Sequence, residues 1–86
     1  MYFVELSQLA DKFLNKLDKH LSERIITKLR ILEKEQVPSD AKFITRHDGE
    51  KVFRIRIGDY RAMYKIKEHD KVVLIVKIDK RPRVYD

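Results

Sequence analysis

The feature that most constrains the fold is a run of alternating apolar and polar residues from Phe53 to Lys67, interrupted only at Gly58-Asp59. Because successive side chains of a β-strand point to opposite faces, each half of this run can bury one set of side chains and expose the other. Glycine at the first central position suits a type II′ turn, so Gly58-Asp59 predicts a two-residue β-hairpin. We therefore expect a sheet with one apolar face and one cationic face.

The two-residue turn also fixes which residues of this hairpin face each other. The apolar pairs share one side of the sheet: Ile57 with Tyr60, Ile55 with Ala62, and Phe53 with Tyr64. On the other side, Arg56 is expected opposite Arg61, and Arg54 opposite Met63. Like charges that face each other across two strands are destabilising, by roughly 1 to 3 kcal/mol from Coulomb's law. An anion bound between the guanidinium groups would remove this repulsion, so the pattern indicates an anion-binding face.

Positive charge is concentrated in the half of the chain that contains the hairpin. Residues 1 to 41 hold seven basic and seven acidic residues, whereas residues 42 to 86 hold thirteen basic and seven acidic residues, a net charge of +6. This polarity is typical of proteins that bind nucleic acids. The absence of cysteine excludes disulfides and thiolate metal sites, and the three histidines lack ligand spacing, so we expect neither a metal nor another cofactor.

We expect one cytoplasmic domain spanning residues 1–86, with no membrane segment, because no apolar run approaches about 18 residues. The stretch "YFVEL" predicts a short N-terminal strand, and Ser7 suits the N-cap of a helix. Apolar residues then recur at helical spacing as far as Leu32. A single helix of that length would be too long for such a small domain. We therefore predict a helical hairpin that breaks near Asp18 to Ser22, with Ser22 as the second cap, and that ends at Val37-Pro38.

After a short strand at "KFIT" and a loop at "RHDGE" comes the hairpin, and then a last strand, "KVVLIVKID". Two registers are open for this strand. A three-residue loop at His69 to Lys71 places Leu74, Val76 and Ile78 on the apolar face and brings Asp79 opposite Arg61. A two-residue loop at His69-Asp70 would put Lys77 in the core, so we favour the first register. The predicted fold class is α+β, with a short N-terminal strand, a helical hairpin and then an antiparallel sheet.

This order of elements, with "RIRIGDYRAMY" in the sheet and "DKRPRVYD" at the C-terminus, resembles the RelE/ParE toxin superfamily, and in particular the RelE-type messenger-RNA interferases. The resemblance covers essentially the whole chain. It implies a fold of the microbial-ribonuclease type and a toxin of a type II toxin–antitoxin system that cleaves mRNA in the ribosomal A site. It also implies inhibition by a RelB-type antitoxin, whose helices wrap the toxin in a hetero-oligomer.

The same resemblance assigns the catalytic residues of this sequence as Arg54, Arg56, Arg61, Arg81 and Tyr85. Metal-free RNA cleavage needs an activated 2′-hydroxyl, a stabilised phosphate and a stabilised or protonated leaving group. Arginine forks bind phosphate oxygens bidentately, so the first three residues suit a clamp on the scissile phosphate. Tyr85 is then the expected general base, and Arg81 stabilises or protonates the 5′-oxygen. Further RNA contacts are expected from five other cations of this half: Lys65, Lys67, Lys77, Lys80 and Arg83.

Two other functions remain open. A ParE-like toxin would share the fold but inhibit DNA gyrase by binding, and the presence of Arg61 together with Arg81 and Tyr85 argues against it, because an inhibitor needs no cleavage centre. A non-catalytic module could instead use the same basic face to bind RNA or the ribosome. Such a module would show salt-dependent binding without forming a product.

Overall fold

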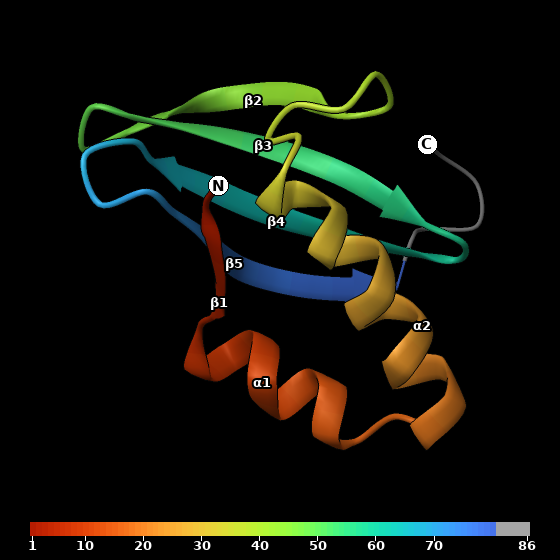
Figure 1. Ribbon diagram of the computed structural model, residues 1–86. Coiled ribbons are helices and arrows are strands. Elements are labelled where there is room, and N and C mark those ends of the chain that lie inside the picture. Colours follow the sequence, from red (N-terminus) through yellow and green to blue (C-terminus); the bar gives the residue numbers. More distant parts are fainter. Residues whose placement is uncertain (81–86) are drawn as a thin grey trace.

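A five-stranded sheet with two helices on one of its faces makes up the computed structural model, which describes residues 1–80 (Figure 1). The strand order is β1-β5-β4-β3-β2. The elements are β1 (Phe3–Leu6), α1 (Gln8–Asn15), α2 (Lys19–Leu29), the 3-10 turn η1 (Arg30–Glu33), β2 (Lys42–His47), β3 (Glu50–Ile57), β4 (Tyr60–Lys67) and β5 (Val72–Lys80). This arrangement confirms the predicted α+β class. None of the helices in residues 1–80 is long and apolar enough to cross a membrane.

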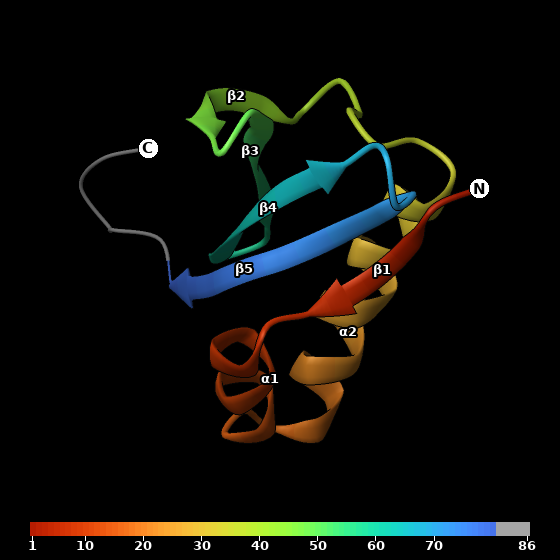
Figure 2. The ribbon, with the colours of Figure 1, turned by 90° about the vertical axis from the view of Figure 1, so that its left-hand side faces the viewer.

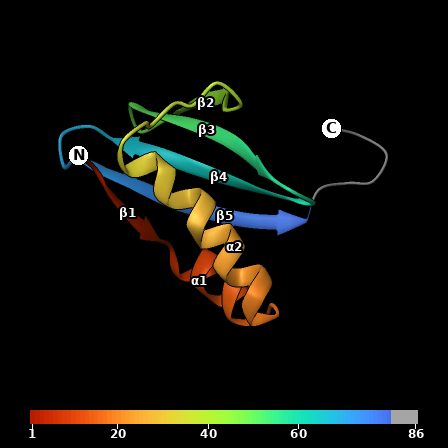
Figure 3. The same cartoon turned by 45° about the vertical axis from the view of Figure 1, so that its right-hand side comes forward.

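The two helices form the predicted hairpin, and α2 runs diagonally across the sheet (Figure 3). The predicted end at Val37-Pro38 is wrong, because α2 ends at Leu29 and η1 at Glu33. Ser7 caps α1 as predicted: its hydroxyl accepts a hydrogen bond from the Ala10 amide at 3.0 Å. The predicted cap of α2 is wrong, because the side chain of Asp18, not of Ser22, accepts the hydrogen bond from the His20 amide at 3.1 Å. Both residue types can cap, and a start at Lys19 adds a helical turn that carries Leu21 against the core.

The core lies between the helices and the covered face of the sheet, as the side view shows (Figure 2). Its largest fully buried side chains are Tyr64, Ile25, Leu29, Leu32, Ile55, Ile75 and Val73. The Tyr64 hydroxyl donates a hydrogen bond of 2.7 Å to the carbonyl of Gln36 in the segment before β2. A buried phenol therefore has its polar atom satisfied while its ring stacks on Phe53, with ring centroids 5.8 Å apart.

The hairpin of β3 and β4 has the register predicted from the sequence. Arg56 faces Arg61, Arg54 faces Met63, and the apolar pairs occupy the covered side. Gly58 has a φ of 60°, which matches the first central position of a type II′ turn and favours glycine. The loop predicted at "RHDGE" is shorter, since Arg46 and His47 belong to β2 and only Asp48-Gly49 form the turn.

A β-bulge between β4 and β5 corrects the predicted register of the last strand. Lys67 to Tyr64 pair with Val72 to Ile75, as in the two-residue-loop alternative, whereas Met63 faces Lys77 and Arg61 faces Asp79, as in the favoured one. The bulge places one extra residue in β5. In the part of β5 before the bulge, each side chain therefore points to the face of the sheet opposite to the predicted one. Ile78 is buried on the apolar face as predicted, whereas the prediction for Leu74 and Val76 is wrong, because Val73 and Ile75 are buried there in their place. The bulge keeps Lys77 out of the core.

Candidate nucleic-acid interface

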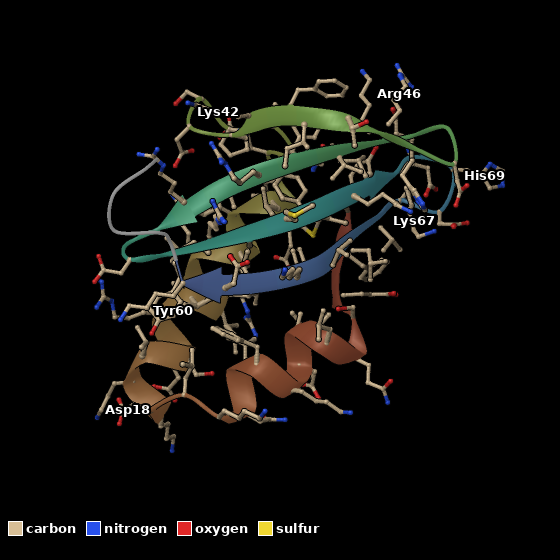
Figure 4. All side chains as sticks on the ribbon, turned by 180° about the vertical axis from the view of Figure 1, so that it is seen from behind. Asp18, Lys42, Arg46, Tyr60, Lys67 and His69 are labelled. Carbon is tan, nitrogen blue, oxygen red and sulfur yellow. The ribbon has the colours of Figure 1, made fainter. Side chains whose placement is uncertain are left out.

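The candidate site lies on the face of the sheet that the helices leave uncovered, here called the outer face (Figure 4). Side chains of one parity in β3 and β4, and of β5 beyond the bulge, point to it. Its two ends differ in composition. The arginine end, near the Gly58 turn, comprises Arg54, Arg56, Arg61, Lys77 and Asp79. The lysine end comprises His47, Glu50, Lys65 and Lys67.

At the arginine end, Asp79 holds two cations of neighbouring strands. The Arg61 Nε donates a hydrogen bond of 3.1 Å to the Asp79 Oδ1, and the Lys77 Nζ lies 3.6 Å from Oδ2. The Arg61 and Asp79 side chains are only 28% and 34% exposed, so this pair is partly shielded from solvent. Arg56 is the cross-strand partner of Arg61, and Arg54 lies one position further along the same face. The structure therefore brings the three predicted clamp residues together, with one of them fixed by a carboxylate.

At the lysine end, one carboxylate serves two lysines. The Glu50 Oε1 lies 3.6 Å from the Lys65 Nζ and 3.5 Å from the Lys67 Nζ. The Lys65 Nζ also lies 3.1 Å from the His47 Nδ1. Figure 4 shows Lys67 at the opposite end of the sheet from Tyr60, which begins β4 beside the Gly58 turn. These two predicted RNA contacts are thus separated from the arginines.

Apolar residues separate the two ends of the outer face. Val52 faces Lys65 across the strands and is 5% exposed although it lies outside the core beneath the helices. The Lys65 side chain is itself only 14% exposed, as expected when a lysine lays its aliphatic stem over an apolar neighbour. Met63 and Leu74 continue this half-buried strip in β4 and β5.

The remaining predicted residues lie elsewhere. Lys80 pairs with Tyr60 at the end of β5 and lines a cleft on the helix side of the sheet, not the outer face. Arg81, Arg83 and Tyr85 lie outside the described residues. Within residues 1–80, no group of three or more histidine and acidic side chains could hold a metal ion.

One cation near the site was not singled out by the sequence pattern. Arg24 of α2 extends to the hairpin turn, where its Nη2 lies 3.9 Å from the position that a Cβ on Gly58 would occupy. Helical periodicity places Arg24 among ordinary exposed residues, and only the packing of α2 against the sheet brings it to the turn. No local signal in the sequence could have found it.

Comparison with known proteins gives consistent results. The family model of the ParE toxin of the type II toxin–antitoxin system parDE matches residues 4–85. No curated protein gives a match. Among solved structures, the chain resembles one from the archaeal RelE–RelB complex of Pyrococcus horikoshii OT3, with 32% sequence identity and a TM-score of 0.84 over 96% of this chain and 98% of that chain.

Two further solved structures share the fold. A chain of the RelBE2 toxin–antitoxin complex from Mycobacterium tuberculosis is 26% identical, with a TM-score of 0.76 over 93% of this chain and 98% of that chain. The isolated RelE toxin of E. coli is 22% identical, with a TM-score of 0.80 over 96% of this chain and 87% of that chain. At this lower identity the likeness concerns the fold alone.

Proposed function

The chain belongs to the RelE/ParE superfamily of toxins of type II toxin–antitoxin systems, and we propose that it is a metal-free endoribonuclease that cleaves mRNA in the ribosomal A site. The observation that carries this proposal is the facing pair Arg56 and Arg61, with Arg54 on the same face. Like charges at facing positions of two strands destabilise a sheet. A phosphate that bridges them turns this cost into binding energy.

The clamp acts on the charge that develops during cleavage. As the 2′-oxygen attacks, negative charge grows on the non-bridging phosphate oxygens, and fixed donors stabilise it without reorganising. Guanidinium forks meet two such oxygens at once. Asp79 accepts a hydrogen bond from the Arg61 Nε and so fixes the position of the guanidinium group that binds the phosphate in this proposal. The carboxylate is therefore a positioning group in this proposal.

In this proposal the C-terminal residues Arg81 and Tyr85 carry out the proton transfer. Tyr85 takes the proton of the 2′-hydroxyl as general base, and Arg81 stabilises or protonates the 5′-oxygen that leaves. Both assignments come from the resemblance to RelE-type interferases, and both residues lie outside the described part of the chain. The described residues support this proposal in that β5 ends at Lys80, which pairs with Tyr60 beside the Gly58 turn, at the arginine end of the sheet.

An antitoxin is the second proposed partner. The similar archaeal and mycobacterial chains were solved in a RelE–RelB complex and a RelBE2 toxin–antitoxin complex. For this chain we propose a RelB-type antitoxin with amphipathic helices and acidic residues, which suit the exposed apolar side chains and the net charge of +6. Addition of the purified antitoxin should raise the melting temperature of the toxin and abolish its activity.

A ParE-like gyrase inhibitor is the competing function, and the matching family model favours it because that model describes ParE toxins. A gyrase inhibitor would need the fold and a binding surface but no phosphate clamp. The two functions differ in their products, since only the interferase creates new RNA ends.

Induced expression followed by primer extension on cellular mRNA tests the proposal. We expect new 5′ ends at codon positions with the wild type, and none with an Arg81→Ala/Tyr85→Phe double variant. Arg30→Gln, which removes an exposed cation of η1 far from the outer face, is the matched control and should cleave normally. Growth arrest without new ends would favour gyrase inhibition, and ribosome binding without new ends would favour the non-catalytic module.

A further inference from the structure

A second cationic site lies on the helix side of the sheet, behind the arginine end. A cleft of about 240 Å³ opens between α2 and the hairpin turn, lined by Leu21, Arg24, Ile57, Asp59, Tyr60 and Lys80, among others. Drug-sized ligands occupy pockets of roughly 300 to 1,000 Å³. This cleft is smaller, and its size suits a fragment such as a phosphate with part of its sugar.

Two cations from different elements converge on this cleft. Arg24 comes from α2 and Lys80 from the end of β5, and both are exposed. Within residues 1–80 neither side chain forms an ion pair, although Asp59 lines the same cleft. Among the described residues that line the cleft, two cations against one carboxylate give a net positive charge. Structural stability does not explain this placement, because an exposed unpaired cation contributes little.

Among the described residues, the hairpin turn lies between the cleft and the phosphate clamp. The Arg24 Nη2 lies 3.9 Å from the position of a Cβ on Gly58, and Gly58-Asp59 directly joins the strands that carry Arg56 and Arg61. Tyr60, which lines the cleft, lies at this end of the sheet in Figure 4. A polyanion bound at the clamp can therefore continue around the turn and meet a second pair of cations.

The geometry points to Arg24 and Lys80 as a subsite for a phosphate of the RNA that neighbours the scissile phosphate. The guanidinium and ammonium groups bind the phosphate oxygens, and the apolar wall of Leu21, Ile57 and the Tyr60 ring takes the adjoining sugar. Phosphate contacts of this kind set the register of a nucleic acid without reading its sequence. The subsite therefore fixes which phosphate enters the clamp. This inference rests on the proposed ribonuclease function.

Salt dependence of binding gives a direct test. A six-nucleotide RNA with 2′-O-methyl sugars cannot be cleaved, because it lacks the attacking hydroxyl, and its affinity can be followed by fluorescence anisotropy. Each phosphate contact to a single strand contributes about 0.7 to the slope of log K against log salt. For Arg24→Gln we expect binding that is about threefold to tenfold weaker at low salt, with a slope smaller by about 0.7. Lys80→Gln should act in the same direction.

Matched variants separate the possible outcomes. Arg30→Gln changes the same residue type beyond the end of α2 and should leave affinity and slope unchanged. Circular dichroism and the melting temperature check that the exposed substitutions leave the fold intact. If Arg61→Gln weakens binding but Arg24→Gln and Lys80→Gln do not, the subsite is wrong and the proposed function stands. If Arg61→Gln is also without effect, the ribonuclease proposal fails, and the subsite with it.

A protein occupant would give a different result. An acidic side chain of an antitoxin could also pair with Arg24 and Lys80. If Arg24→Gln weakened antitoxin binding while leaving RNA affinity and its salt slope unchanged, the cleft would be part of a protein interface, and the RNA subsite would be overturned.

Discussion

The two ends of the outer face are built from the same strands, yet they treat positive charge in different ways. At the lysine end, Glu50 is shared by Lys65 and Lys67. At the arginine end, Asp79 is likewise shared by Arg61 and Lys77, but Arg54 and Arg56 add two more cations from β3. The strand cations of the arginine end, Arg54, Arg56, Arg61 and Lys77, therefore outnumber those of the lysine end, Lys65 and Lys67. The difference teaches that net charge alone does not locate a site; its concentration does.

The type of cation sharpens this contrast. Lysine carries a point charge on a flexible stem, whereas the planar guanidinium of arginine presents a fixed fork that matches phosphate oxygens. The lysine end suits general attraction of a polyanion, and the arginine end suits a fixed geometry at one phosphate. Substitutions at the two ends test this division.

Replacement of a single clamp residue should separate the two ends most clearly. Arg61→Gln should lower the single-turnover rate of mRNA cleavage on programmed ribosomes about a hundredfold, because a fixed donor to the transition state is lost. Lys67→Gln, the matched change at the lysine end, should lower it less than about threefold. Equal losses from the two variants would mean that the ends do not differ in function.

Removal of the carboxylate at the arginine end should separate binding from cleavage. Asp79→Ala frees Arg61 from its hydrogen bond, so we expect the cleavage step to slow about tenfold through misplacement of the guanidinium. Affinity for the 2′-O-methyl RNA should not fall, since a negative charge has been lost. Weaker RNA binding by this variant would contradict a positioning role.

Removal of the carboxylate at the lysine end should have a smaller effect, of opposite sign. Glu50→Gln leaves Lys65 and Lys67 without their shared partner. We expect RNA to bind about twofold to threefold more tightly at low salt, with a steeper salt dependence and an unchanged rate of cleavage. Anisotropy titrations between low and moderate salt measure this, and Lys67→Gln in the same background should reverse it.

A substitution in the core beneath the sheet should change the free energy of unfolding and should affect the arginine end and the lysine end of the outer face equally. Tyr64→Phe leaves the Gln36 carbonyl without its donor, at a cost of about 1 to 2 kcal/mol in the free energy of unfolding. Burial, and then the nearby charge of Asp40, raise the pKa of Tyr64. The unfolded chain therefore ionises first, so the stability from this group is present below about pH 10 and lost above it.

Urea unfolding at neutral and alkaline pH measures the effect of this substitution. The wild type should lose stability more steeply than Tyr64→Phe once the pH passes about 10. If both proteins showed the same alkaline slope, the buried phenol would not be the group responsible.

The hairpin could be predicted from the sequence because its constraints are local. Strict alternation tells the two faces apart, and a two-residue turn leaves one register, so the pairing of Arg56 with Arg61 followed directly. The last strand could not be predicted in the same way. In "KVVLIV" the residues that would point to either face of the sheet are apolar, so the sequence pattern does not indicate a bulge that exchanges the two faces.

The missed features share a physical cause. Asp18 and Ser22 both carry oxygens that can cap a helix, and only the packing of Leu21 and Ile25 beneath the sheet decides between them. Arg24 reaches the Gly58 turn because α2 runs diagonally across the sheet. Such choices depend on contacts between distant segments, which a local pattern does not contain.

The pairing of β1 with β5 has a consequence for how the protein is made. Within residues 1–80, β1 pairs only with β5, in parallel, and the Ser7 hydroxyl donates a hydrogen bond to the Val76 carbonyl, 69 residues away along the chain. Contacts so distant in sequence form late and slow the folding of a small domain. During translation, β1 can therefore pair only after β5, the last strand of the described residues, has been synthesised. A nascent chain that stops short of β5 lacks both the partner strand of β1 and Asp79, which binds Arg61, so the complete outer face forms only after β5 has been synthesised.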